Sequence, residues 1–382
     1  MMIMRKLLMI MILGACSFDS SESGKSGSSP DQLEKMAYAE LLFSINDNPD
    51  EAGFGNMLFL EMDKGGNFIV TDVMRNSLVK FTKEGEKKWE YRQTGRGPGE
   101  FQSINLIADP KSGKIAVYDP LLFRVQIFDP NMENVIKNLR VESPDNTSLQ
   151  LLGLSDNGLY FKGFKGYSLF NYEESRELEV FFQGYDQDTP VPVFSVPKTE
   201  IKPIVDENDR SISVFNRPFG RRVSLTMRDD EFIYISNERF GLKRFDIDGS
   251  LISEQRVSWQ PAPFEISDEI LSEYIKSFFP ENFSENFDHR KTIMALRSSF
   301  DPEREVYFRD SLVDVEGRIW FELYTEFFED ESRWIVWDLS SDELFQVVFP
   351  GNHVRVQNAK DSFAVSFKRN EYELESVRAF SF

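Results

Sequence analysis

The sequence predicts an all-β fold, a ring of six four-stranded blades. Three observations support this prediction: a repeated unit, the period of that repeat, and the shortness of the strands within it. Residues 65–86 and 112–133 share a glycine, an alternating strand that ends in aspartate, a polar turn, and a second strand that ends in an aromatic residue. Asp72 and Asp119 lie 47 residues apart, as do Phe81 and Phe128. Short strands repeated at about 40–50 residues are typical of β-propeller blades.

Weaker copies of this unit extend along the rest of the chain, and we take one aromatic residue of each as an anchor. The six anchors are Phe81, Phe128, Phe170, Phe245, Trp337 and Phe380. Three of the five gaps between them span 42 to 47 residues, whereas gaps of 75 and 92 residues require insertions or a seventh blade. Six blades fit the pattern better than seven.

The longest gap contains an insertion, residues 258–300, with one predicted helix in "SDEILSEYIKSFFP". Ser267 is the expected N-cap and Pro280 the stop. Apolar residues recur with a helical period at Ile270, Leu271, Tyr274, Ile275 and Phe278. We expect this stripe to pack on a blade; a lid or a docking helix is the alternative.

The end of the chain, "SVRAFSF", reads as a strand that continues to the last residue. A propeller ring commonly closes when strands from both chain ends pair in one blade, which removes an exposed edge. Residues 36–45 or 56–62 would supply the N-terminal partner.

The first residues have the layout of a secretory signal. Arg5 and Lys6 precede an apolar run over 7–13 that is too short to span a membrane. "Leu-Gly-Ala-Cys" at 13–16 resembles the lipobox of bacterial lipoproteins, which implies cleavage before Cys16 and attachment of acyl chains such as palmitate. We therefore expect a signal peptide over 1–15, a flexible tether over 16–31 and the propeller over 32–382. The residue after Cys16 is not aspartate, and by resemblance to a sorting rule of Gram-negative bacteria this favours the outer membrane.

The charge of the chain limits its partners. The net charge is −20, and removal of Arg5 and Lys6 makes it −22. An acidic body repels the phosphates of nucleic acids and the headgroups of anionic lipids, so we expect no nucleic-acid partner. The membrane, through the lipid anchor, and a protein, small-molecule or glycan partner are expected instead.

The glycine-rich stretch "GRGPGEF", residues 95–101, is predicted to connect two blades. A phosphate-binding loop would open a helix, but a strand, a turn and another strand follow here. Residues 95–129 resemble an NHL repeat, in which Gly-x-Gly-x-Gly-x-Phe precedes two strands and an Arg-hydrophobic-Gln-hydrophobic-Phe segment; Ile104 stands where that family commonly has proline. Residues 217–249 resemble the six-bladed propeller lipoproteins of Bacteroidetes-type bacteria.

Few residues offer catalytic chemistry. The chain has two histidines, His289 and His353, and Cys16 is its only cysteine, so a multi-histidine metal site and cysteine catalysis are excluded. We predict no catalytic or metal-binding residues. Some six-bladed lactonases hold calcium in the channel, but no calcium-loop spacing occurs here. The candidate ligand-binding residues lie near connections between blades: Arg96, Arg221, Arg222 and His353.

These observations favour a lipid-anchored propeller outside the cytoplasmic membrane that acts as a non-enzymatic binding or scaffolding module without a cofactor. The alternative is an enzyme with its site in the channel, a calcium-dependent lactonase-type hydrolase or a lyase. Carboxylates from three or more blades that converge on the channel would favour the enzyme, and aromatic residues that fill the channel would favour a scaffold. A broad apolar patch near 258–300 would indicate structural support for a larger assembly.

Overall fold

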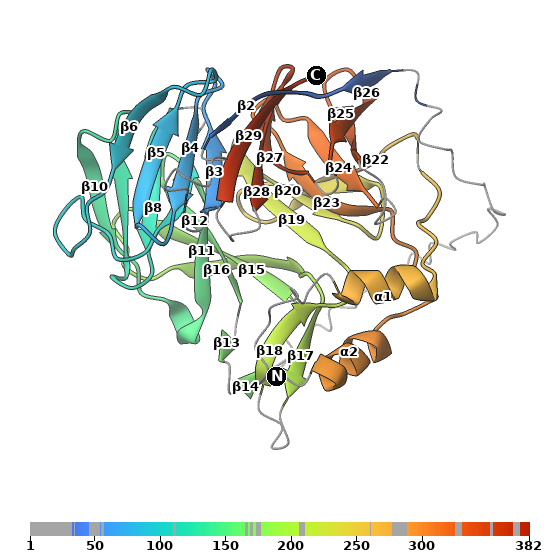
Figure 1. Ribbon diagram of the computed structural model, residues 1–382. Helices are drawn as coiled ribbons and strands as arrows, with labels where there is room; N and C mark the ends of the chain where they lie inside the picture. Colours follow the sequence, from blue (N-terminus) through green and yellow to red (C-terminus); the bar gives the residue numbers. More distant parts are fainter. Residues whose placement is uncertain are drawn as a thin grey trace, which may run out of the picture.

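The computed structural model confirms an all-β ring of six four-stranded blades (Figure 1). It describes residues 33, 35–45, 54, 57–109, 112–164, 167–168, 171–172, 177–205, 211–259, 261–276, 289–324, 331–351, 354–369 and 375–382. The predicted signal peptide, Cys16 and the tether lie outside these residues. Among the described residues, no helix is both long and apolar enough to cross a membrane.

Each blade is an antiparallel sheet whose first strand lies beside the first strands of the neighbouring blades. The first three blades, from the innermost strand outward, are β3 (Met57–Met62), β4 (Phe68–Asp72), β5 (Ser77–Phe81) and β6 (Lys87–Tyr91); β7 (Asn105–Ala108), β8 (Ile115–Asp119), β9 (Arg124–Phe128) and β10 (Val135–Arg140); and β11 (Ser148–Leu154), β12 (Gly158–Phe164), β15 (Glu177–Gly184) and β16 (Val191–Pro197).

The remaining blades follow the same order. They are β19 (Val223–Arg228), β20 (Glu231–Ser236), β21 (Gly241–Phe245) and β22 (Leu251–Arg256); β23 (Phe308–Val313), β24 (Ile319–Leu323), β25 (Glu331–Asp338) and β26 (Glu343–Pro350); and β27 (Arg355–Lys360), β28 (Phe363–Arg369), β29 (Glu375–Ser381) and β2 (Glu40–Ile45).

The N-terminal segment closes the ring. β2 pairs with β29 as the outermost strand of the last blade, with Leu41 opposite Phe380. Just before it, β1 (Met36–Tyr38) pairs in parallel with β26 and adds a fifth strand to the fifth blade. The prediction that 36–45 pairs with the C-terminal strand is confirmed for β2, whereas 57–62 forms the innermost strand of the first blade.

Five of the six predicted anchors lie on the third strand of a blade. These are Phe81, Phe128, Phe245, Trp337 and Phe380. The anchor at Phe170 was wrong: the third strand of that blade is β15, and Phe170 itself lies outside the described residues. A short hairpin, β13 (Tyr167–Ser168) and β14 (Asn171–Tyr172), lengthens the connection between the second and third strands. This excursion displaces the repeat from its period.

Further insertions account for the two long gaps. The hairpin of β17 (Ile201–Val205) and β18 (Ser211–Asn216) stands between the third and fourth blades. Two helices, α1 (Asp268–Lys276) and α2 (His289–Ser298), stand between the fourth and fifth. Both insertions lie in connections between blades, and each such connection leads to the start of the next innermost strand. The hairpin and the helices therefore lie at the same end of the ring, which is the lower part of Figure 1.

The predicted helix forms as α1, and the described part of its stripe is core; Phe278 and the predicted stop, Pro280, lie outside the described residues. The Ser267 hydroxyl accepts a hydrogen bond from the Ile270 backbone at 3.2 Å, as an N-cap does. Leu271, Tyr274 and Ile275 are buried with Phe219 and with Leu296 of α2 in a separate apolar cluster. The second helix, α2, was not predicted. The packing of this stripe supports neither a docking helix nor a broad apolar patch at the described part of the insertion.

The main core is divided into six apolar clusters, one between each pair of neighbouring blades. Phe101 of the glycine-rich connector belongs to the cluster between the first two blades, with its ring centroid 5.8 Å from those of Tyr91 and Phe128. Gln126 of β9 accepts a hydrogen bond from the Gly99 backbone at 2.6 Å and donates one to the Glu100 carbonyl at 3.0 Å. The stretch is therefore a connector between blades, as predicted.

Substitution of Phe101 by alanine should lower the free energy of unfolding by about 3–5 kcal/mol, because a fully buried ring leaves a cavity between two blades. Urea unfolding followed by circular dichroism measures this change. The control is Leu251→Ala on β22, where the side chain is 54% exposed and the expected change is within about 0.5 kcal/mol. An equal effect of the two substitutions would contradict the role given to the connector.

Candidate functional site

A cavity of about 470 Å³ lies on the axis of the ring and is lined by the innermost strands of all six blades. One lining residue from each of these strands is Phe59, Leu106, Leu151, Thr226, Val313 and Asn358. The lining comes from the later part of each strand and the turn that follows it. The cavity therefore lies at the end of the ring opposite to α1, α2 and the β17–β18 hairpin.

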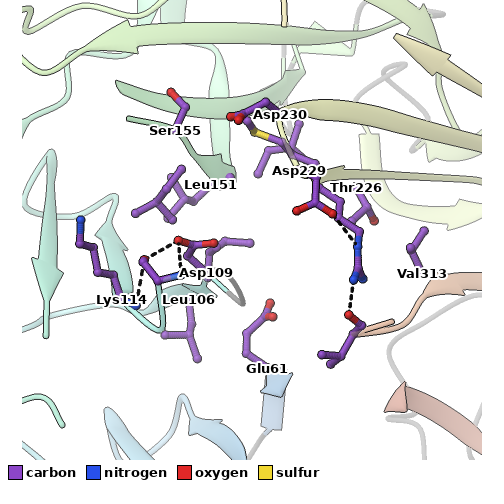
Figure 2. Close-up of a pocket in the computed structure, with 18 of the residues that line it drawn as sticks. Glu61, Leu106, Asp109, Lys114, Leu151, Ser155, Thr226, Asp229, Asp230 and Val313 are labelled. Atoms are coloured by element: carbon purple, nitrogen blue, oxygen red, sulfur yellow. Dashed lines mark hydrogen bonds and ion pairs between the residues drawn. The ribbon is translucent and has the colours of Figure 1, made fainter. Parts of the chain in front are cut away.

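The wall mixes apolar side chains with about as many polar and charged ones. Figure 2 shows Leu106, Leu151 and Val313 around the space, with Thr226 among them. Gln150 and Asn358 add side-chain amides. Apolar surface beside placed polar groups is found in small-molecule sites, and the share of polar groups in this lining suits a polar ligand.

Glu61 is the one acidic residue of β3, and its side chain points into the cavity in Figure 2. Burial raises the pKa of Glu61 to about 8, although the positive charge of Lys162 lowers this pKa in part. The carboxyl group is therefore mainly protonated at pH 7 and can donate a hydrogen bond.

Lys162 of β12 also lines the cavity, and burial lowers the pKa of its ammonium group while Glu61 opposes this shift. Burial causes both pKa shifts, because the charged form of each side chain is less well hydrated in the cavity wall than in water. The cavity thus holds a carboxyl and an amine that both favour the neutral form more than they would in water.

The rim of the cavity carries more acids, several of which hold turns. Asp109 accepts hydrogen bonds from the backbone and hydroxyl groups of Ser112, in the turn between β7 and β8. Asp229 and Asp230 form the two-residue turn between β19 and β20, with φ angles of 48° and 61°. Such a hairpin turn needs left-handed backbone at both positions, which aspartate tolerates better than most residues.

Arg228, beside this turn, joins two blades at the rim. Its guanidinium donates hydrogen bonds to the carbonyls of Asp314 and Val315, which follow β23. It also lies 3.3 Å from the Asp229 carboxylate. This arginine is therefore occupied in holding the rim together.

Acidic residues from five blades line the cavity: Glu61, Asp109, Asp156, Asp229, Asp230 and Asp314. They surround the space but do not meet at one point. In the described part of the chain, no three histidine, cysteine or acidic side chains are placed to hold a metal ion together. The geometry therefore offers hydrogen bonds and negative charge at the rim and gives no support for a calcium site.

The structure does not bring the predicted ligand-binding residues together. Arg96 is exposed on the connector between the first two blades, and His353 lies outside the described residues. His289 is the first residue of α2. Neither Arg221 nor Arg222 lines the axial cavity.

Arg221 belongs to an ion-pair network centred on Glu200, which Arg217 and Arg304 also approach. Burial would raise the pKa of Glu200, but hydrogen bonds from Arg304 and from the Arg221 backbone hold it below its usual value. Glu200 is therefore charged and satisfied by its neighbours. The structure gives Arg221 a role in packing the end of the ring that carries the insertions.

Arg222 donates a hydrogen bond to the Tyr274 hydroxyl of α1 at 2.6 Å. Near it, Glu322 of β24 is buried, which raises the pKa of Glu322 to about 7, while Arg309 at 3.9 Å, Arg355 and Arg222 lower it. This polar cluster lies beneath α1, away from the axial cavity.

Sequence reasoning missed Glu61, Lys162 and Glu322. Each is a single charge in an otherwise apolar or uncharged strand: "MLFLEM", "GLYFKGF" and "IWFEL". A charge in a predicted buried strand is a signal of a shifted pKa or a polar site, and it could have been found.

The stability of the protein should report the titration of Glu61. Its pKa of about 8 in the folded state exceeds the value of 4.5 expected for an unfolded chain, so its contribution to stability is fully present below pH 4.5 and is lost as the pH rises through about 8. We expect Glu61→Gln to become more stable, relative to the wild type, as the pH rises from 5 to 8. Urea unfolding at several pH values measures this difference, with Glu84→Gln at an exposed turn as the control. A difference that does not change with pH would contradict the burial of Glu61.

No family model matches the chain, and no curated protein is similar to it in sequence. Among solved structures, the chain is similar to a putative exported protein from Bacteroides fragilis, with a TM-score of 0.45, 13% identity, and coverage of 90% of this chain and 98% of that one. It is also similar to a member of the DUF4221 family from Bacteroides vulgatus, with a TM-score of 0.45, 10% identity and coverage of 90% and 98%. A streptogramin B lyase has a TM-score of 0.38, 11% identity and coverage of 89% and 87%. At these identities the likenesses concern the fold only.

Proposed function

We propose that this protein is a binding module of the cell envelope, anchored through lipid on Cys16, that takes a small polar ligand into its axial cavity without transforming it. The observation that carries the proposal is the cavity itself, which all six innermost strands line. The packing of Phe101 between the first two blades and the hydrogen bonds of Gln126 with the connector support an NHL-like repeat. The lipobox and the absence of aspartate after Cys16 support attachment at the outer membrane.

The chemistry of the cavity favours a neutral or cationic ligand. The six acids of the lining outnumber its four cationic side chains, Lys64, Lys114, Lys162 and Arg228, so the charge of the cavity disfavours an anion. Inside, Gln150, Asn358 and the protonated Glu61 offer hydrogen bonds between apolar walls. A hydroxyl-rich ring such as a monosaccharide has both the polar edges and the apolar faces that this lining matches.

An enzyme is the second candidate, and Glu61 is the observation that favours it. A carboxyl group with a pKa near 8 in a cavity can accept or donate a proton near neutral pH. Lys162 lines the same cavity, interacts with Glu61 electrostatically, and is also shifted toward its neutral form. A hydrolase or lyase that works by acid–base catalysis would use such a pair; a binding module uses the same groups as hydrogen-bond partners.

Thermal unfolding with three sugars of one shape and different charge tests the proposal. We expect millimolar glucose or glucosamine to raise the melting temperature and glucuronate to leave it unchanged, because a ligand that binds the folded state stabilises it by mass action. Thr226→Phe should abolish the shift by filling the cavity, and Val191→Phe on the exposed face of β16 is the matched control.

A shift with glucuronate alone, or equal shifts in Thr226→Phe and the wild type, would contradict the proposed site. The protein is an enzyme, and not a binding module, if it turns over a glycoside or ester of the bound sugar and Glu61→Gln abolishes this turnover. Calcium followed by EDTA belongs in the same experiment. A shift with calcium that EDTA reverses would overturn the metal-free site.

A further inference from the structure

An exposed apolar and basic surface lies on the first two blades, at the end of the ring opposite to the cavity. We call it the turn patch: Met74, Arg92, Arg96, Leu121 and Phe123. Met74 lies in the turn between β4 and β5, Leu121 and Phe123 lie in the turn between β8 and β9, and the arginines lie on the connector from β6 to β7. Met74, Leu121 and Phe123 are 76%, 63% and 55% exposed.

The turn patch repeats from one blade to the next. Met74 and Leu121 are 47 residues apart, so they occupy the same position of the unit. Two adjacent blades therefore present a large apolar side chain at the tip of the same turn. Single exposed apolar residues are common, but neighbouring ones at equivalent positions form a surface.

Phe123 is held in a conformation that its residue type disfavours. Its φ angle is 51°, and the equivalent residue of the first blade is Asn76, with φ 53°. Asparagine tolerates left-handed backbone, and the Asn76 side chain also donates a hydrogen bond to the Phe101 carbonyl at 2.6 Å. A bulky aromatic residue in this conformation costs stability, and its exposure means that little packing offsets the cost. An exposed, strained aromatic residue is a candidate for contact with something outside the chain.

The surface is rigid before any contact is made. Arg124 donates hydrogen bonds to the carbonyls of Arg96, Gly97 and Glu100 at 2.8, 2.9 and 2.6 Å. The Asp119 carboxylate accepts hydrogen bonds from the backbone of Leu121 and Leu122 at 3.0 and 3.1 Å. These bonds fix the connector and the turn relative to each other, so little further ordering is needed on binding.

The charge of the turn patch is opposite to that of the whole protein. Arg92 and Arg96 are exposed, and neither has an ion pair with another residue that the structure describes. Of the nearby acids, Asp72 and Asp119 are 0% and 1% exposed, and the half-buried Glu100 carboxylate accepts a hydrogen bond from the Gly97 backbone at 2.6 Å. Although the chain carries a net charge of −20, charges more than about 8 Å from a surface are largely screened at physiological ionic strength. A negatively charged partner therefore meets a locally positive surface.

We propose that the turn patch docks the ring onto an anionic lipid bilayer. The inference rests on the proposed lipid anchor, which places a bilayer within reach. The 16 residues from 17 to 32 span at most about 55 Å, so the anchor limits distance but does not fix orientation. Apolar tips flanked by arginines suit the boundary between headgroups and acyl chains. Docking through this face directs the mouth of the cavity away from the bilayer.

The test uses a chain that begins at residue 17, which contains no cysteine and no lipid, so failure of the anchor does not affect it. A single cysteine is introduced at Leu121 and labelled with an environment-sensitive dye. The probe is vesicles of phosphatidylcholine with about one third phosphatidylglycerol, compared with phosphatidylcholine alone. We expect a blue shift with the anionic vesicles, at least about fivefold weaker binding to the neutral ones, and loss of binding as salt rises. The matched control is a dye at Leu251, which is 54% exposed on β22 and should not respond.

Phe123→Asn separates docking from folding. Asparagine suits the left-handed backbone, so we expect the melting temperature to hold or rise while binding to anionic vesicles falls severalfold. Equal responses at residues 121 and 251, binding that ignores lipid charge, or unchanged binding in Phe123→Asn would each overturn the proposal. Binding to a soluble acidic protein but not to the vesicles would assign the turn patch to a protein partner and also overturn it.

Discussion

The pairing of β2 with β29 is the interaction on which the rest of the structure depends. Each blade is stabilised by its two neighbours, since the apolar core is divided into six clusters between adjacent blades. An open ring would expose two of those faces and an unpaired strand edge. Closure also brings all six innermost strands to one axis, where the cavity lies. The site thus exists only because the two ends of the chain share a blade.

The two ends of the ring have different chemistry because of where the chain turns. At the cavity end, short turns follow the innermost strands, and acids such as Asp109 and Asp314 hold them by accepting backbone hydrogen bonds. Much of the negative charge at the rim is therefore structural, and the groups left for a ligand include Glu61, Lys162 and the side-chain amides of Gln150 and Asn358. The other end receives the hairpins, the helices and the connectors between blades, which provide an outer surface.

The sequence predicted the ring well where the repeat keeps its period. Phe81 and Phe128, 47 residues apart, occupy the same place on β5 and β9. It failed at Phe170 because the β13–β14 hairpin interrupts the repeat, and a local pattern does not reveal such an excursion. The sequence also did not predict the parallel pairing of β1 with β26, because the single stretch 36–45 contributes strands to two blades. The lone charge of Glu61 in "MLFLEM" was a signal that could have been found, whereas its place in a cavity lined by all six blades could not, because the lining residues lie far apart in the chain.

Hydrogen exchange on a chain that begins at residue 46, compared with one that begins at residue 32, tests the closure most directly. We expect loss of β1 and β2 to remove protection from β29 and also from β3 and β4, because the cluster between the last and first blades depends on the closed ring. The melting temperature should fall as well. Unchanged protection in β29 and in the first blade would show that the ring closes without its N-terminal strand.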